Sequence, residues 1–326
     1  MATGPSLDVV GIGSCAVDFY AMVPRLLGSG EKINAERTSI YPGGLTANNL
    51  TQLARLGAKA AWLGLIGDDE NGRIIQKAFT DEGMDLSGIE VVKGERSSVT
   101  WIPVNLAGDH CVYMFPNITN KLSVMQVRNR FASHIQRAKH FHSEASQINI
   151  APIKEGMRIA KDANVRVLFD MDVTPNFFAQ ANLGRQDELC ECLRMVNVLK
   201  PSKRAGRELT GESDYERMAD RLLGLGPDTI AINLGRDGCL VATRKEKFHI
   251  PPFEVDIVDS TGAGAAFMGS ISYGLLQGWD LQRIGLFANA CSALCCMRVG
   301  SRAMSKRDEV LSFIKSKSTS AMPAFA

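Results

Sequence analysis

The sequence predicts an α/β protein whose doubly wound, mostly parallel sheet is flanked by helices and accompanied by a small β-sheet lid. Short apolar runs alternate with amphipathic runs of helical length along most of the 326-residue chain. Such alternation requires crossover connections, which give parallel strands covered on both faces. Residues 98–115 break this pattern with two strand-like runs around a turn, which is typical of a hairpin.

The first elements are a buried strand ending in glycines, a helix closed by Gly57, a strand and a second helix. The hairpin follows, and because two strands alone are marginal in water, we expect a third strand at 34–41. The lid therefore takes its strands from about residues 14–41 and 98–115. In chain order, the predicted ranges up to the hairpin are strand 7–13, a helix through 50–56 capped by Gly57, strand 62–67, helix 73–82, and strands 99–104 and 110–115.

The alternation of strands and helices then returns. The predicted ranges are helix 124–135, strand 138–142, helix 152–163, and strands 165–170, 196–199 and 229–234. We expect residues 1–315 to form a single α/β domain and the small, polar residues 316–326 to form a disordered tail. Ligands of such sheets bind beyond the carboxyl ends of the strands, so residues that follow strands are the site candidates.

Composition excludes several classes of function. Lys plus Arg total 37 and Asp plus Glu total 35, a balance that argues against nucleic-acid binding. No apolar run approaches the length of a membrane span. Eight cysteines without a CxxC pair, behind a short polar N-terminus, predict free thiols and a cytoplasmic protein. The pairs Cys190/Cys192 and His140/His142 each lack a second ligand pair for zinc.

The most informative segment is the small-residue run at 258–269. Gly262, Ala263 and Gly264 lead directly into an apolar helical pattern. A helix start leaves several N–H groups free at the positive end of the helix dipole, which suits a phosphate. A plain tight turn with a glycine N-cap is the alternative interpretation.

Two earlier segments offer groups that suit a polyol. Gly43 and Gly44 open a helix, and Asn48 supplies both a donor and an acceptor. Asp18, after the first strand, can accept two hydroxyl hydrogen bonds, although a solvated loop acid is the alternative.

The order of these motifs resembles that of the ribokinase-like carbohydrate kinases, also called the phosphofructokinase B family. The resemblance covers about residues 7–315 and ends in the motif Asp259-x-Thr-Gly-Ala-Gly. It implies a ribokinase-like fold with a lid over the substrate, ATP-dependent phosphorylation of a hydroxymethyl group on a sugar or nucleoside, and a homodimer formed through the lid. ATP and Mg²⁺ are the implied cofactors, and K⁺ is a further candidate near Cys291, Gly300 and Ser301.

The resemblance also assigns roles to individual residues. It implies an anion hole at Gly262, Ala263 and Gly264 that stabilises the transferring phosphoryl group. The residues that it places at the sugar are Asp18, Gly43, Gly44, Asn48 and Glu144. Those that it places at the nucleotide are Asn233, Gly235, Gly238 and Asn289.

The first departure from the family pattern is Ala265, where the motif ends in the aspartate that acts as general base. Alanine has no proton acceptor, and a base contributes about 10²–10⁴-fold to the rate, so we expect the chain as written to be nearly inactive. Two explanations remain open. One is an engineered Asp→Ala change made to trap a substrate complex, and the other is a natural pseudokinase or sugar sensor.

The second departure concerns magnesium. Many relatives carry Asn-x-x-Glu where this chain has Ser202 and Ala205. Lys203 and Arg204 could meet phosphate charge directly, and the alternative, which we favour, is that they are solvated residues at a helix start.

The resemblance implies a sugar or sugar derivative as the substrate, and the run 169–175 is similar to that of relatives that act on sulfonated fructose, a ketose. Nucleoside and ketogluconate kinases are alternatives, as is a non-catalytic sugar- or nucleotide-binding protein. An anionic substituent would need a basic partner, for which Arg96, Lys121 and Arg137 are candidates.

Overall fold

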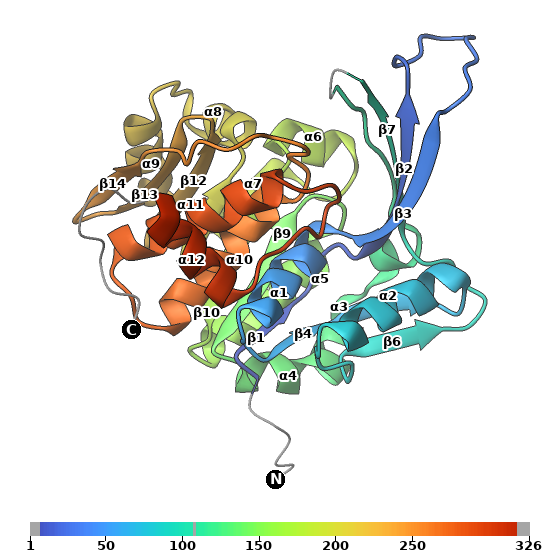
Figure 1. Cartoon of the computed structure of the whole chain (residues 1–326). Helices are drawn as coiled ribbons and strands as arrows, with labels where there is room; N and C mark the ends of the chain where they lie inside the picture. The colour runs from blue at the N-terminus through green and yellow to red at the C-terminus, as the bar shows by residue number, and fades with distance from the viewer. Residues whose placement is uncertain (1–6, 107–108, 318–326) are drawn as a thin grey trace.

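The computed structural model describes residues 7–106 and 109–317, and its centre is one eight-stranded sheet (Figure 1). The strand order is β14-β13-β12-β11-β10-β9-β1-β4, with parallel pairing from β4 to β12 and antiparallel pairing of β13 and β14 at one edge. The strands of this sheet are β1 (Val9–Gly11), β4 (Ala60–Trp62), β9 (His140–Ala145), β10 (Arg166–Met171), β11 (Val198–Pro201), β12 (Thr229–Gly235), β13 (Gly238–Thr243) and β14 (Lys247–Ile250).

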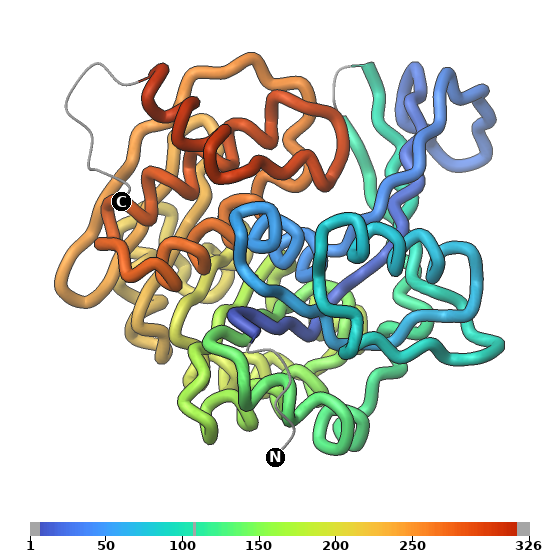
Figure 2. Tube along the Cα trace, turned by 60° about the horizontal axis from the view of Figure 1, so that its bottom comes forward, coloured from blue at the N-terminus to red at the C-terminus, as the bar shows by residue number. Residues whose placement is uncertain are grey.

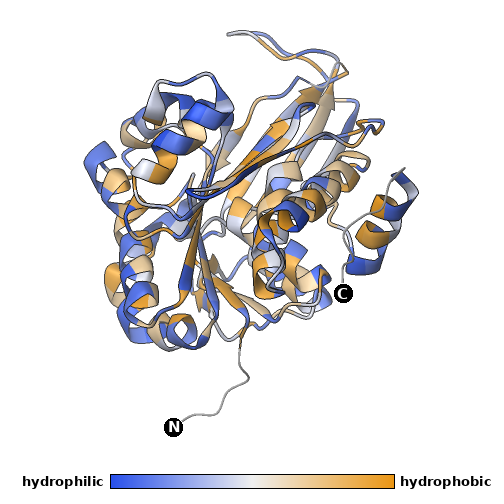
Figure 3. Cartoon of the chain, turned by 90° about the vertical axis from the view of Figure 1, so that its left-hand side faces the viewer, coloured by the Kyte–Doolittle hydropathy of each residue, from blue (hydrophilic) through white to orange (hydrophobic). Residues whose placement is uncertain are grey.

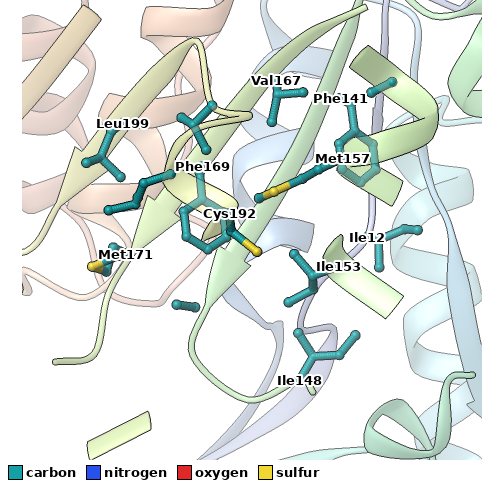
Figure 4. Packing of buried hydrophobic residues seen from close by; sticks show 14 of the residues in the cluster. Ile12, Phe141, Ile148, Ile153, Met157, Val167, Phe169, Met171, Cys192 and Leu199 are labelled. Atoms are coloured by element: carbon teal, nitrogen blue, oxygen red, sulfur yellow. The ribbon is translucent and has the colours of Figure 1, made fainter. Parts of the chain in front are cut away.

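Helices cover both faces of the sheet, because alternate side chains of each strand point to opposite faces. In β10, Val167 and Phe169 belong to one buried cluster and Leu168 to the other. Figure 4 shows Phe141, Phe169 and Met157 packed together in the first cluster. In Figure 3 the hydrophobic colours gather on the central strands and on the inner sides of the helices.

The two helical layers differ in sequence origin. The layer over the first cluster is formed by α3 (Val124–Gln126), the π-helical η2 (Val127–Phe131), α4 (Ala132–Arg137), α5 (Ile150–Asp162), α6 (Pro175–Gln180), α7 (Gln186–Leu193), α8 (Lys203–Thr210) and α9 (Tyr215–Gly224). The layer over the second cluster is formed by α1 (Leu45–Arg55), α2 (Glu70–Asp81), α10 (Ala263–Leu276), α11 (Leu281–Cys296) and α12 (Arg307–Lys317). No helix within the described ranges is long and apolar enough to cross a membrane.

A separate four-stranded sheet projects from the body as the lid, in the order β3-β2-β7-β8 (Figure 2). Its strands are β2 (Ala16–Val23), β3 (Arg37–Gly43), β7 (Val99–Asn105) and β8 (Tyr113–Phe115). The pairing of β2 with β7 is parallel, and the hairpin partners β7 and β8 pair antiparallel. The lid thus joins two segments that lie far apart in the sequence.

Several predicted boundaries are wrong. The predicted strand 62–67 is two strands in different sheets, because the chain leaves the main sheet after β4 and β5 (Gly64–Gly67) pairs with β6 (Ile89–Val92). Glu144 lies within β9 rather than after it. Asp18 follows the first strand as predicted and lies within the lid strand β2, which excludes the alternative of a solvated loop acid.

At the C-terminus, Ser316 and Lys317 of the predicted tail end α12, which the buried Ile314 anchors. Residues 318–326 of that tail lie outside the described residues, as do 107–108 of the predicted hairpin turn. The short helical turn η1 (Asn117–Lys121) follows the hairpin.

Candidate active site

The candidate site lies where the parallel strands of the main sheet end. The carboxyl ends of parallel strands meet at one edge, so side chains from distant segments come together there. Glu144 near the end of β9, Asp170 near the end of β10 and Lys200 near the end of β11 are all buried at this edge. The helix α10 begins beside them.

The turn that opens α10 depends on glycine. Gly262 is the N-cap with φ 88°, and a Cβ on it would lie 2.3 Å from the carbonyl oxygen of Ser301. No side chain caps the helix. Within residues 7–106 and 109–317, the amides of Gly264 and Ala265 have no hydrogen-bond acceptor. Two N–H groups therefore remain available at the positive end of the helix dipole.

Two cavities meet at this turn. The larger, of about 800 Å³, is lined by Ala263 and Gly264 together with residues from β11, β12 and α11. The smaller, of about 500 Å³, lies between the lid and the segment 257–261. Arg236, Ile257 and Ser260 line both. The turn before α10 is therefore a wall common to the two cavities.

Three of the four residues predicted for the nucleotide line the larger cavity, namely Asn233, Gly235 and Asn289. Asn233 is held by Ser292, whose Oγ accepts from its Nδ2 at 2.8 Å. The fourth, Gly238, lies in the β12–β13 turn, where a Cβ would lie 2.0 Å from the carbonyl oxygen of Ile250. Close packing of the hairpin accounts for this glycine without a ligand.

The residues predicted for the sugar are tied together by one loop. Ser301 Oγ donates to Asp18 Oδ2 at 2.8 Å, and Arg302 donates to Asn48 Oδ1 at 2.7 Å and to the carbonyl of Gly43 at 3.1 Å. Asp18 pairs in register with Tyr41, which lines the smaller cavity, but the five residues predicted for the sugar are not among those that line it. Burial raises the pKa of Asp18. Arg302 was missed at the sequence level because an isolated arginine near the C-terminus carries no pattern.

Gly44 and Glu144 instead support the start of α1. A Cβ on Gly44 would lie 2.5 Å from Cys15 Cα, so packing requires this glycine. Glu144 Oε2 accepts from the amide of Thr46 at 2.7 Å and from its hydroxyl at 2.6 Å. The carboxyl is fully buried, which raises its pKa to about 7.

Ala265 lies in a small apolar cluster. Its exposed fraction is 2 %, and it groups with Ala266, Cys295 and Met304. Leu45 packs against the same cluster. The position where the family motif places its base is thus buried between α10, the start of α1 and the loop before α12.

A buried ion pair that the sequence did not reveal lies below the α10 turn. Lys200 Nζ donates to Asp170 Oδ1 at 2.8 Å, and both side chains are almost fully buried. A Cβ on Gly264 would lie 3.1 Å from Lys200 Nζ. A positive charge is therefore fixed next to the two free amides.

The side chains at the larger cavity do not fit a magnesium ion. Ser202 is the N-cap of α8, accepting from the amide of Ala205 at 3.2 Å, and Ala205 is buried in the core. Magnesium prefers oxygen ligands, usually carboxylates. Glu254 is the one acidic residue among those that line this cavity, and the described ranges contain no group of three His, Cys, Asp or Glu suited to a metal.

The groups suggested for potassium are already engaged or buried. The carbonyl oxygen of Gly300 accepts from the amide of Ala303 at 3.2 Å, the hydroxyl of Ser301 donates to Asp18, and Cys291 is buried within α11. The three basic candidates for an anionic substituent lie elsewhere. Arg96 lines a cavity on the outer face of the lid, Lys121 pairs with Glu95, and Arg137 bonds within α4.

The chain is similar to known kinases in sequence and in fold. It is 29 % identical to the aminoimidazole riboside kinase of Salmonella typhimurium over 85 % of this chain and 89 % of that one. It is 27 % identical to the ribokinase of Haemophilus influenzae over 93 % and 97 %. The fold matches that of Arabidopsis thaliana ribokinase, solved with ribose and ATP, with a TM-score of 0.81, 22 % identity and coverage of 95 % and 99 %.

An E. coli protein solved with ATP and Mg²⁺ has the same fold, with a TM-score of 0.84 and 24 % identity over 95 % of this chain and 99 % of that one. The fold predicted from the sequence, a ribokinase-like α/β sheet with a separate small sheet, is thereby confirmed. The family model described as pfkB family carbohydrate kinase matches residues 6–308. The chain belongs to the pfkB family of carbohydrate kinases.

Proposed function

We propose that the protein is an ATP-dependent sugar kinase scaffold that lacks its general base. The nucleotide occupies the 800 Å³ cavity, the sugar occupies the 500 Å³ cavity, and the phosphoryl group passes between them at the α10 turn. The observation that carries this proposal is the turn itself. It lines both cavities, and it leaves the amides of Gly264 and Ala265 without an acceptor among the described residues.

Each group in the site has a task in this proposal. The free amides donate to the oxygens of the transferring phosphoryl group, where positioning and charge stabilisation supply most of the catalysis. Asn233 and Asn289 position the nucleotide. Asp18 and Asn48 orient the sugar hydroxyls once the sugar replaces their bonds to Ser301 and Arg302. The attacking hydroxyl is a primary one, and its proton has no acceptor at position 265.

Restoring the base tests this proposal. Ala265→Asp should raise phosphoryl transfer from ATP by at least about 100-fold, because the apolar surroundings of position 265 favour a carboxylate with a raised pKa. The assay uses a panel of ketoses, including sulfonated fructose, with sugar acids and nucleosides. Ala303→Asp, which adds an acid beside the same cluster, is the matched control and should give no gain.

A second candidate function, non-catalytic binding of sugar or nucleotide, is favoured by the apolar packing around Ala265. If Ala265→Asp gives no turnover with any sugar on the panel while ATP still binds, this second function stands and the kinase proposal fails. The codon at position 265 in the encoding gene shows whether the alanine is natural.

We extend the proposal to a homodimer formed through the lid. The outer face of the lid exposes large apolar side chains, with Ile40, Trp101 and Tyr113 each more than half exposed. These residues line a cavity of about 810 Å³. A contiguous apolar face of this kind is typical of an interaction surface. Sedimentation at micromolar concentration should give a dimer, and a monomer would overturn this extension.

A further inference from the structure

The nucleotide cavity of the proposed function is lined by cations where the family pattern places magnesium-organising groups. Lys200, Lys203 and Arg236 all line it, together with Gly264 of the α10 turn. Glu254, its one acidic lining residue, is exposed on the segment between β14 and α10. Because Asp170 neutralises Lys200, the net positive charge on the wall of this cavity comes from Lys203 and Arg236.

Two of these cations are held in place by the fold. Lys200 is 5 % exposed and bound to Asp170, which keeps its ammonium group next to Gly264. Lys203, at the start of α8, donates to the carbonyl of Leu234 at 3.2 Å, which brings its ammonium group to the end of β12. An ammonium group has three N–H donors, so each lysine keeps donors for phosphate oxygens.

The residues that would organise a metal are used in other ways. Ser202 lines the cavity but its hydroxyl caps α8, and Ala205 packs in the core, so neither position presents a carboxylate to a metal. Asp170 accepts from Lys200 through Oδ1, is fully buried, and is not among the residues that line the cavity. A divalent cation that entered with the nucleotide would face the charges of Lys203 and Arg236 without a carboxylate beside it. Like charges on the wall of one cavity repel each other, and more strongly than in water because the dielectric constant is lower there.

We infer that this cavity binds ATP as the free polyanion, with Lys200, Lys203 and Arg236 offsetting the phosphate charge in place of a magnesium ion. The inference rests on the proposed function, because it takes the 800 Å³ cavity to be the nucleotide site. It makes the three cations phosphate-binding residues. A single nucleotide-affinity measurement under two ionic conditions distinguishes the inference from the function on which it rests.

The test is calorimetric titration of the full chain with ATP, once in EDTA and once in excess magnesium at equal ionic strength. The dissociation constant in EDTA should be equal to or lower than the value in magnesium, because excess magnesium converts ATP into the complex that Lys203 and Arg236 disfavour. Weakening by about tenfold or more in EDTA would overturn the inference and leave the proposed function intact. No binding in either condition would overturn the proposed function itself.

Charge-removing variants sharpen the test. Lys203→Met should weaken ATP binding in EDTA by about tenfold, the effect of one charge-assisted hydrogen bond. Lys77→Met, an exposed lysine paired with Asp81 on α2, is the matched control and should change nothing. Because Lys200→Met alone would leave Asp170 buried without a partner, it is made together with Asp170→Asn, and thermal unfolding checks the fold. ATP binding in EDTA as tight as that of the parent in both variants would contradict the inference.

Discussion

Helices α1 and α10 both begin at a glycine with positive φ, 94° at Gly44 and 88° at Gly262, and neither has a side-chain N-cap. The two helices differ, however, in whether their first amides have hydrogen-bond acceptors. At α1, Ser14 Oγ accepts from the amide of Leu45, and Glu144 accepts from the amide of Thr46. At α10, the amides of Gly264 and Ala265 have no acceptor among the described residues.

The difference teaches that a glycine-rich helix start is not by itself an anion site. The α1 start is completed by the protein, and its glycines are explained by close contacts with Asp18 and Cys15. The α10 start is left incomplete beside two cavities and a fixed lysine. An anionic ligand is expected at the α10 start, because its free amides lie beside a cavity at the positive end of the helix dipole.

The largest expected effect comes from Gly262→Ala. The new Cβ would lie 2.3 Å from the Ser301 carbonyl at a backbone conformation unfavourable for alanine. We expect a loss of about 2–4 kcal/mol in the free energy of unfolding, measured by urea denaturation. Because Ser301 also holds Asp18, both ATP and sugar binding should weaken.

The matched control for this variant is Gly57→Ala, at the end of α1. Gly57 has φ 101° but no atom within 4 Å of a built Cβ, so it isolates the backbone strain. We expect about 1 kcal/mol for this change and no effect on ligand binding. Equal losses in the two variants would show that the contact with Ser301 is unimportant.

A smaller, pH-dependent effect is expected from Glu144→Gln. Burial raises the folded pKa of Glu144 to about 7, above its ordinary value of 4.5. The stability gained from the neutral carboxyl is therefore complete below pH 4.5 and is lost as the pH rises toward 7. Glutamine does not titrate, so the unfolding free energy of the variant should fall less than that of the parent between pH 4.5 and 7. The two falls should differ by on the order of 1–2 kcal/mol.

ATP affinity completes the test of Glu144. Because Glu144 serves α1 and not the α10 turn, Glu144→Gln should leave the dissociation constant for ATP unchanged. Glu155 is a control for the direction of the pH effect, because its pKa is shifted the other way. Its bonds to Arg158 and Arg128 lower its pKa to about 2, so its contribution is lost as the pH falls rather than as it rises. Weaker ATP binding in Glu144→Gln would remove the distinction between the two helix starts.

The fold and the α10 turn could be predicted from the sequence because both depend on local patterns. Alternation of strands and helices fixes the parallel sheet, and the motif around Gly262 is contiguous. Contacts between segments far apart in the chain could not be predicted from the sequence. The pair Asp170–Lys200 spans 30 residues, and the bond from Arg302 to Asn48 spans 254. The capping of α1 by Glu144 also depends on β9 lying beside α1, which no local pattern reports.

The most direct measurement follows the backbone amides themselves. In amide NMR spectra of the isotopically labelled chain, adding ATP should shift the resonances of Gly264 and Ala265 strongly and leave those of Leu45 and Thr46 nearly unchanged. This pattern would place the phosphates at the free amides of α10. Shifts at Leu45 and Thr46 with none at Gly264 and Ala265 would contradict the account.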